Sequence, residues 1–355
     1  SLVFDLRNNG GGSLQEAVNI VNMFVPKGIT LVKTVGKMER ANKEYKTTVE
    51  PIDTLMPIVV LVNDETASAS EITSGSLQDL DRAVVLGTRT YGKGLVQVSM
   101  DLPYNANLKL TTSKYYIPSG RCIQAINYKH TNGGYTEHVP DSLTHVFRTA
   151  NGREVRDGGG IKPDVEVRPD SLPNIAFYLA SSGRDSTEVM WNWELQYLKK
   201  HPTIGPAKTF IISDADFEDF KQAVLKSGFK YDRESKKYLE NLVKLAKFEG
   251  YYDDAKPEFE ALEKKLNHNL AKDLDYNKQT LKKVLTSDLV SAYYYQKGSL
   301  ENSLQFDKQW KKAVEILKNP VEYKKLLQSV VSQPLVKLEP AINVAVDNKS
   351  KTKAK

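Results

Sequence analysis

The chain has 355 residues, of which 40% are hydrophobic and 26% are charged, a composition ordinary for a soluble globular protein and sufficient for two domains. Its 50 Lys and Arg residues nearly balance its 44 Asp and Glu residues, so the net charge of +6 is weak support for a nucleic-acid partner. The single cysteine, Cys122, excludes an intrachain disulfide and a cysteine-based zinc site, and no apolar run approaches the ~20 residues that span a bilayer.

Residues 2–170 alternate between strand-like and helix-like patterns. Residues 58–62 form an uninterrupted apolar run, which is typical of a strand buried on both faces. Further strands are predicted at 3–6, 29–35, 83–87 and 108–116, and helices at 14–24 and 69–80. This alternation predicts an α/β domain with a largely parallel sheet. Because the chain opens directly on a strand pattern, we expect further parts of this domain to precede residue 1.

The composition changes after Pro169, where helical patterns rich in Lys, Glu, Leu and Tyr begin. Ser213 is a predicted N-cap, and Gly228 is predicted to end the same helix. We therefore expect four segments: an α/β core at 1–170, a connecting helix and linker at 171–204, an all-α domain at 205–332, and a basic, disordered tail at 333–355.

Ser68 is the first candidate for chemistry. It lies between the strand at 58–62 and the following helix, at the edge of the sheet where open α/β folds bind ligands. Its neighbours Ala67 and Ala69 are small, and the free N–H groups of a helix start can stabilise an oxyanion. The spacing of Ser68 and Glu71 also fits a capping box, so capping and catalysis compete for one hydroxyl.

Lys93 is the candidate base for this serine. Two glycines flank it in Tyr91-Gly92-Lys93-Gly94, which follows a predicted buried strand. A free lysine has a pKa near ~10.4, so burial would have to lower that pKa by about 2–3 units before the amine could act as a base. Gln97 lies four residues further on and could orient the amine without adding charge. The alternative is a solvated lysine in a turn.

Five motifs occur in an order that resembles the carboxyl-terminal processing proteases, also called tail-specific proteases. The motifs are Asp5-Leu6-Arg7-Asn8-Asn9-Gly10-Gly11-Gly12, Thr66-Ala67-Ser68-Ala69-Ser70-Glu71-Ile72, Gly87-Thr88-Arg89-Thr90-Tyr91-Gly92-Lys93-Gly94 with Gln97, Tyr116-Ile117-Pro118-Ser119-Gly120-Arg121, and Gly160-Ile161-Lys162-Pro163-Asp164. In that family the nucleophile and the lysine are 25 positions apart, which matches Ser68 and Lys93 (93 − 68 = 25), whereas Ser70 would give 23. The resemblance covers residues 2–168.

The resemblance also implies roles for residues around this pair. It assigns Gln97 as the residue that orients the lysine. It implies an oxyanion hole made by main-chain N–H groups, which map to Ala69 and to Gly11 of the glycine-rich turn, with Gly10 and Gly12 as alternatives. No metal and no cofactor is expected.

For the whole molecule, the resemblance implies a crotonase-like protease core and a serine endopeptidase that cleaves protein substrates near accessible C-termini. It further implies an upstream PDZ domain and a location in the bacterial cell envelope, periplasmic or membrane-associated. The helical region resembles extensions of longer bacterial relatives, and would serve as a substrate clamp, a self-association surface or an adaptor platform. We expect neither a nucleic-acid partner nor a transmembrane segment.

Two alternatives stay open. One is a catalytically silent peptide-binding scaffold of the same fold. The other is a crotonase-like acyl-CoA enzyme, which would need a carboxylate acid–base pair beside its oxyanion hole and an adenine-binding loop. The sequence identifies neither of these two features.

Overall fold

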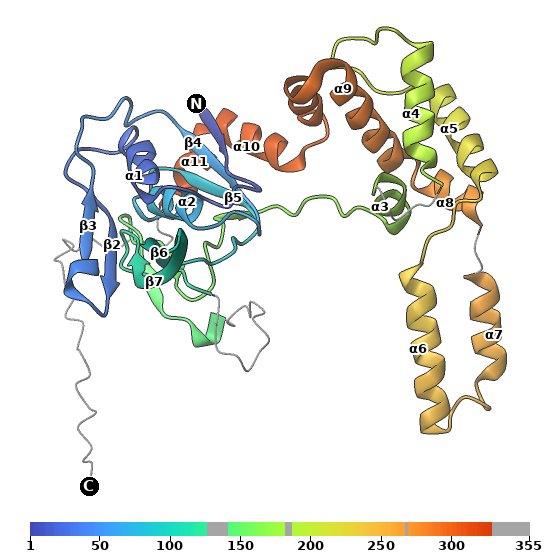
Figure 1. Ribbon diagram of the computed structural model, residues 1–355, viewed down its shortest axis with the longest axis horizontal. Coiled ribbons are helices and arrows are strands. Elements are labelled where there is room, and N and C mark those ends of the chain that lie inside the picture. Colours follow the sequence, from blue (N-terminus) through green and yellow to red (C-terminus); the bar gives the residue numbers. More distant parts are fainter. Residues whose placement is uncertain (126–140, 182–186, 267–268, 329–355) are drawn as a thin grey trace. The chain divides into compact units, whose positions relative to one another are not determined.

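The computed structural model describes residues 1–125, 141–181, 187–266 and 269–328. These residues form two compact units (Figure 1). The first consists of residues 1–167 together with the chain from Ala313 onward, and the second consists of residues 168–312. The first unit therefore draws on both ends of the described chain, which differs from the expected division. The tail expected at 333–355 lies outside the described residues.

The centre of the first unit is a parallel sheet with the strand order β1, β4, β5, β10. The bounds of these strands are Leu2–Asp5, Ile58–Val62, Val84–Gly87 and Val165–Glu166. All five side chains of β4 are buried, because this strand pairs with β1 on one side and β5 on the other and both of its faces are covered. The prediction of a buried strand at 58–62 and of a parallel sheet is confirmed.

Alternate residues of β4 point to opposite faces of this sheet, and each face has its own cover. The covering helices are α1 (Leu14–Asn22), α2 (Ala69–Asp79), α10 (Lys308–Lys318) and α11 (Pro320–Leu326). Val60 and Val62 share a hydrophobic cluster with α1 and α2. Val59 and Leu61 share another cluster with residues of α10 and α11. Both sides of the central strand are therefore dry.

The hydroxyl of Tyr323 attaches α11 to the central strand. It accepts a hydrogen bond from the N–H of Ile58 at 2.9 Å and donates to the carbonyl of the same residue at 3.1 Å. These partners are 265 positions apart in the sequence. Residues 313–328, expected in a separate helical domain at 205–332, thus belong to the first unit, because the second apolar face of a parallel sheet requires a cover.

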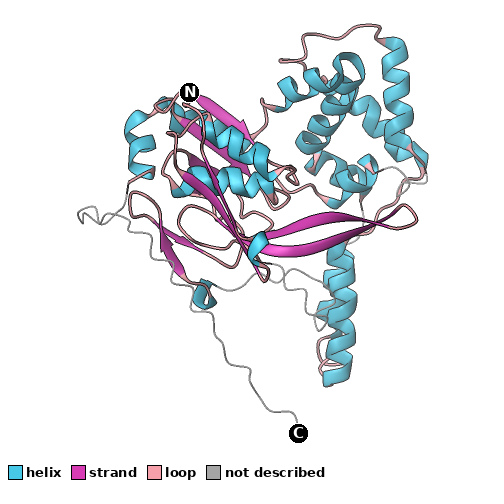
Figure 2. Ribbon diagram, turned by 60° about the vertical axis from the view of Figure 1, so that its left-hand side comes forward, coloured by secondary structure: helices cyan, strands magenta, loops and turns pink. Residues whose placement is uncertain are grey.

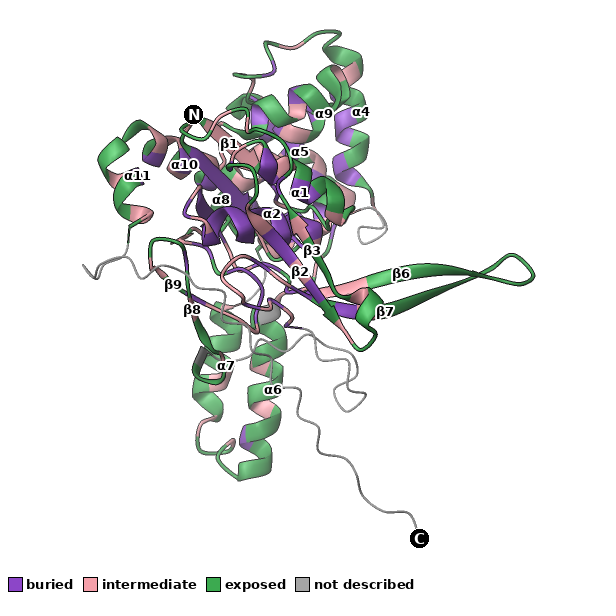
Figure 3. Cartoon of the chain, turned by 90° about the vertical axis from the view of Figure 1, so that its left-hand side faces the viewer, coloured by how far each residue is buried: buried purple, intermediate pink, exposed green. Residues whose placement is uncertain are grey.

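A second, antiparallel sheet has the order β3, β2, β7, β6. Its strands span Lys43–Lys46, Thr30–Gly36, Ala106–Tyr116 and Leu95–Leu102. β6 and β7 form a long hairpin that projects from the unit (Figure 2), and its outer part is exposed (Figure 3). β7 was predicted and β6 was not, although the alternation Val98-Ser99-Met100-Asp101 carries the period of a strand. The first unit also contains a short antiparallel pair of strands, β8 (Val146–Arg148) and β9 (Glu154–Arg156). It has 3₁₀ turns at Glu39–Ala41 and Asp141–Leu143.

The second unit contains only helices and loops in its described residues. The helices are α3 (Asn174–Ala180), α4 (Val189–Lys200), α5 (Asp214–Ser227), α6 (Glu234–Glu249), α7 (Lys256–Lys265), α8 (Leu270–Tyr276) and α9 (Lys278–Ser303). The predicted ends of α5 are confirmed: the Ser213 side chain accepts from the N–H of Asp216, and Gly228 adopts a left-handed conformation with φ of 77°.

Helices α3 and α4 lie in the hydrophobic core of this unit. The indole ring of Trp193 on α4 contacts the ring of Phe220 on α5, with 5.4 Å between ring centres, and its N–H donates to Asp219 at 2.9 Å. The segment 171–204, expected as a connection, therefore contributes to the helical core, because a tryptophan buries a large apolar area. In the part of the chain that the structure describes, no helix combines the length and apolarity needed to cross a bilayer.

Candidate active site

The side chains predicted to carry chemistry meet at one cavity of the first unit. Ser68, Lys93 and Gln97 all line this cavity, whose volume is about 350 Å³. Ser68 comes from the turn before α2, Lys93 from the loop before β6, and Gln97 from β6 itself. The remaining walls come from the glycine-rich turn, the start of α1, α2, and Lys109 and Tyr115 of β7. The fold thus brings three segments of the chain to one hollow.

Ser68 occupies a strained turn between β4 and α2. Its φ of 56° and ψ of −118° lie where residues with a side chain are rarely found. Two neighbouring residues hold this turn in place. The hydroxyl of Thr66 donates to the carbonyl of Leu6 at 2.8 Å, and the N–H of Ala67 donates to the carbonyl of Asn9 at 3.0 Å. Both bonds attach the turn to the chain just after β1, so the surrounding structure maintains the strain.

The glycine-rich turn packs directly against the Ser68 turn. Gly11 has a φ of 95°, and a Cβ at this position would lie 2.6 Å from the carbonyl oxygen of Ala67 and 2.7 Å from the nitrogen of Ala69. Only glycine fits such an approach between two backbones. Gly10 has open space around it and no such restriction.

The carboxylate of Glu71, which is fully buried, ties the Ser68 turn to the Lys93 loop. One oxygen, Oε2, accepts from the main-chain N–H groups of Ser68 and Lys93, both at 2.9 Å. The other, Oε1, accepts from the N–H of Gly92 at 2.7 Å and from the hydroxyl of Thr90 at 2.5 Å. Burial raises the pKa of Glu71, and these four donors act in the opposite direction. Three of these four partners are main-chain N–H groups, which can only donate, so both oxygens of Glu71 act as acceptors.

The capping-box arrangement predicted for Ser68 and Glu71 is present. In its well-formed half, the N–H of Ser68 donates to Oε2 of Glu71 at 2.9 Å. The Ser68 hydroxyl itself makes no ordinary capping hydrogen bond. Glu71 thus holds this turn through its carboxyl group, and Ser68 lines the cavity.

Tyr115 joins the same two segments from β7. Its hydroxyl lies 2.6 Å from the carbonyl oxygen of Lys93 and 3.2 Å from that of Ser68. Burial raises the pKa of Tyr115 well above its ordinary value, so the phenol keeps its proton and acts as a donor. Gly94 next to Lys93 is also held, because its N–H donates to the Gln124 side chain at 2.6 Å. The main chain around Lys93 is thus fixed on both sides.

The side chains of Lys93 and Gln97 are less enclosed than expected. Lys93 is half-buried and Gln97 is exposed. Neither side chain forms a hydrogen bond or an ion pair with another described residue. The amine therefore has no carboxylate partner in the described part of the chain, as a base requires, but its expected desolvation is only partial. A substrate bound in the cavity would displace more of the water around it.

Two main-chain N–H groups beside Ser68 have no acceptor among the described residues. One belongs to Ala69 at the start of α2, and the other to Gly12, which lines the cavity. The N–H of Gly11, in contrast, donates to the side chain of Asn9 at 3.0 Å. Free donors at a helix start are suited to a developing negative charge on oxygen.

Sequence reasoning missed the residues that position this site. Glu71 was interpreted only as part of a cap, and Tyr115 only as part of a strand. The sequence places this carboxyl group and this phenol within predicted elements. No local pattern shows which distant residues they contact.

Among the described residues, no group of three His, Cys, Asp or Glu side chains could hold a metal ion. Burial raises the pKa of the Cys122 thiol, which suits a packing residue better than a nucleophile.

Two family models match this chain. Residues 1–131 match the model described as "Peptidase family S41", and residues 178–317 match "Probable PDZ-protease, C-terminal helical domain". The first match contains the whole cavity described above, and the second contains most of the helical unit. The predicted combination of a protease-type α/β core and a helical C-terminal region is confirmed.

Several curated proteins are similar over part of their length. A "Carboxy-terminal-processing protease" of Bartonella bacilliformis is 43% identical over 124 residues, which cover 35% of this chain and 28% of that protein. A "C-terminal processing peptidase, chloroplastic" of Tetradesmus obliquus is 33% identical over 172 residues, covering 48% and 30%. A "Probable CtpA-like serine protease" of Staphylococcus aureus is 31% identical over 253 residues, covering 68% and 38%. The chain thus spans well under half the length of these relatives, and the resemblance expected from the five motifs is confirmed.

Proposed function

Because residues 1–131 belong to peptidase family S41, we propose that this chain carries the catalytic centre of a serine endopeptidase that cleaves protein substrates near their C-termini. In this proposal Ser68 is the nucleophile, Lys93 the general base and Gln97 the residue that orients the lysine. The observation that carries it is the meeting of these three side chains at one cavity, beside the free N–H groups of Ala69 and Gly12.

The reaction follows from the chemistry of these groups. Neutral Lys93 takes the proton of the Ser68 hydroxyl while Oγ attacks the scissile carbonyl carbon. The carbonyl oxygen becomes an oxyanion, which the N–H of Ala69 and an N–H of the glycine-rich turn stabilise. We expected Gly11 to be the second donor, but its N–H already donates to Asn9. Gly12, which lines the cavity and whose N–H has no acceptor among the described residues, is therefore the favoured second donor. Lys93 then protonates the leaving amine, and water hydrolyses the acyl-enzyme. No step needs a metal or a cofactor.

Glu71 and Tyr115 act as positioning residues in this scheme. Each bonds to the main chain of both Ser68 and Lys93, so the two reacting residues cannot separate without breaking buried hydrogen bonds. Prior placement of reacting groups removes an entropic cost from the reaction. The strained turn of Ser68 is held by the same contacts.

An exposed strand edge supports an extended protein substrate. β6 is the terminal strand of the second sheet, and its residues Leu95, Val96 and Gln97 line the cavity. A peptide could pair with this edge through its main chain and present a carbonyl to Ser68. As the family resemblance implies, the proposal includes a cell-envelope location and a role of the helical unit in adaptor binding or self-association. Cell fractionation would test the first of these and light scattering the second.

Active-site labelling tests the proposed chemistry. A fluorophosphonate applied at neutral pH should add covalently to Ser68, detected by peptide mass spectrometry. Lys93→Ala should abolish both labelling and peptide hydrolysis while leaving the unfolding midpoint unchanged, since the Lys93 side chain has no partner in the described residues. Ser70→Ala is the matched control for Ser68→Ala, because it removes a neighbouring hydroxyl of the same helix start.

The outcomes separate the proposal from its rivals. If a folded protein with an intact Ser68 takes up no label, the chain is the silent peptide-binding scaffold considered above. If Lys109→Ala abolishes labelling and Lys93→Ala does not, the wrong lysine has been assigned, since both line the cavity.

A further inference from the structure

The cavity at Ser68 contains a lysine that the proposed reaction does not use. Lys109 of β7 lines this cavity together with Lys93, and its described lining residues include no aspartate or glutamate. The Lys109 side chain forms no hydrogen bond or ion pair with another described residue. A hollow whose charged groups are all cationic attracts anions. Because Lys93 has to be neutral to act as the base, Lys109 is the cation that this hollow offers to a substrate.

The register of the β6–β7 hairpin places Lys109 away from the reacting atoms. Lys109 lies opposite Ser99, which is two positions beyond Gln97 on β6. Two positions along a strand correspond to about 7 Å. The carboxylate of Asp101, opposite Asn107 on the same hairpin, accepts from the Asn107 side chain at 2.9 Å and does not line the cavity. The Lys109 amine is therefore available at the outer end of the cavity.

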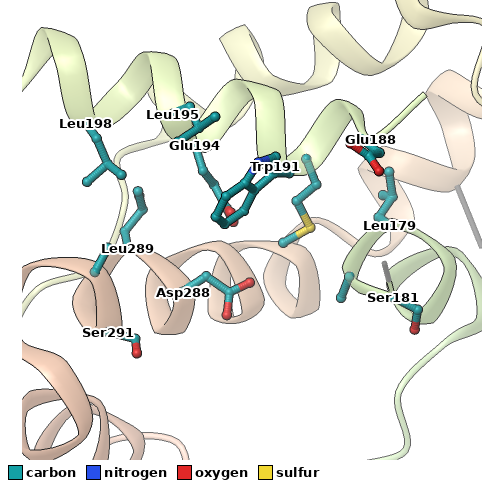
Figure 4. A pocket seen from close by; sticks show the side chains of 13 residues that line it. Leu179, Ser181, Glu188, Trp191, Glu194, Leu195, Leu198, Asp288, Leu289 and Ser291 are labelled. Carbon is teal, nitrogen blue, oxygen red and sulfur yellow. The ribbon is translucent and has the colours of Figure 1, made fainter. Parts of the chain in front are cut away.

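The larger cavity of the helical unit shows the opposite situation (Figure 4). It has a volume of about 650 Å³ between α3, α4 and α9, and Glu194 of α4 and Asp288 of α9 point toward one another across it. A side-chain hydrogen bond joins these two carboxyl groups. Burial and the Asp288 charge raise the pKa of Glu194 to about 8, so Glu194 keeps its proton at neutral pH and donates this bond. These two groups are partners of one another, whereas Lys109 has no such partner among the described residues.

We infer that Lys109 binds the free carboxylate at the C-terminus of a substrate, an inference that rests on the proposed peptidase function. A peptide that ends a few residues beyond the scissile bond would place its carboxylate at Lys109. The carboxylate would then lie apart from the Lys93 amine, which a nearby anion would hold in its protonated form. The apolar side chains of Leu14, Ile72 and Leu95 in the cavity wall suit apolar residues in the same short stretch of substrate. Lys109 is thus a specificity-determining residue that directs cleavage to bonds near the end of a chain.

Binding of matched peptides to Ser68→Ala tests this inference without requiring catalysis. In calorimetric titrations, acetyl-Ala-Leu-Ala-Ala with a free carboxylate should bind about fivefold more tightly than the same peptide with a C-terminal amide, as expected for an ion pair that is open to water. The preference should decrease as the salt concentration rises. It should disappear when Lys109→Met is added to Ser68→Ala and remain when Lys109→Arg is added instead. The peptide acetyl-Ala-Leu-Ala-Glu-amide carries its carboxylate on a side chain, and binding as tight as that of the free acid would overturn the assignment to a C-terminus.

Lys114→Met is the matched control, since Lys114 is an exposed cation of the same strand that does not line the cavity. Added to Ser68→Ala, it should keep the preference for the free acid, and circular dichroism would show that each variant folds. Equal binding of acid and amide to folded Ser68→Ala, or an unchanged preference after Lys109→Met, would overturn the inference. Loss of fluorophosphonate labelling in Lys109→Met alone would also overturn it, because Lys109 would then act in the chemistry. A wild-type protein that takes up no label would instead refute the proposed peptidase function and leave the binding result standing.

Discussion

Replacing Glu71 by glutamine tests how the candidate site is held together. The change keeps the size of the side chain but turns one acceptor oxygen into an NH₂ group. In the folded protein each carboxylate oxygen faces two donors, with Ser68 and Lys93 at Oε2 and Gly92 and Thr90 at Oε1. Whichever way the amide is oriented, its NH₂ therefore points at donors.

The least costly orientation places the NH₂ at the Oε1 position. There it can donate to the hydroxyl oxygen of Thr90, but the N–H of Gly92 loses its acceptor. A buried N–H without an acceptor costs about 1–3 kcal/mol, and the remaining bonds also weaken because their acceptor is no longer charged. If the full cost appears as opening of the Lys93 loop, the rate of Ser68 labelling falls by about 5- to 160-fold.

Three measurements check this reasoning on the same protein. Denaturant unfolding gives the loss of stability, hydrogen exchange gives the protection of the Gly92 and Lys93 amides, and the fluorophosphonate reaction gives the reactivity of Ser68. We expect faster exchange at these two amides together with slower labelling. Glu65→Gln is the matched control, since Glu65 lies in the turn between β4 and α2, close to Glu71 in the chain, and is exposed.

One result would refute the argument. If Glu71→Gln keeps the amide protection and the labelling rate of the wild type, then Glu71 does not hold the two segments in register. A loss of stability without a change in Ser68 reactivity would likewise show that this residue supports only the fold.

Three further predictions concern other parts of the chain. Gly11→Ala should displace the Ser68 turn and lower labelling by more than tenfold, whereas Gly10→Ala, with free space for its methyl group, should not; equal effects would show that the close approach is unimportant. Tyr323→Phe leaves the N–H of Ile58 without its acceptor and should lower the free energy of unfolding by about 1–3 kcal/mol, and a change near zero in denaturant titrations would contradict the anchoring role. Glu194 has its pKa raised from 4.5 to about 8, so the folded protein holds a proton that the unfolded chain releases between these values. The contribution of Glu194 to stability is therefore greatest below pH 4.5 and is lost as the pH rises to 8. Glu194→Gln should remove this contribution to the slope and be more stable than the wild type at pH 9 by on the order of several kcal/mol; parallel pH profiles for the two proteins would disprove it.

Local patterns were sufficient to predict several elements. The apolar run at 58–62 became the fully buried β4, because only a strand covered on both faces tolerates five apolar residues in succession. The predicted caps of α5, Ser213 and Gly228, formed as expected, since capping depends on residues three or four positions apart. The local pattern did not predict β6, because the glycines around Lys93 indicate a turn directly before the alternating residues of this strand.

The amino-acid sequence by itself determined the candidate nucleophile and base, through motif order and the spacing of Ser68 and Lys93. It also determined the α/β character of residues 2–170, since the periods of strands and helices depend on the spacing of apolar residues that are close in the sequence. Only the tertiary structure decided that Glu71 and Tyr115 connect the two reacting segments, and that α11 covers the sheet beside Ile58. These contacts join residues far apart in the chain, and hydrogen bonds between distant groups depend on the folded arrangement of backbones that no local pattern specifies.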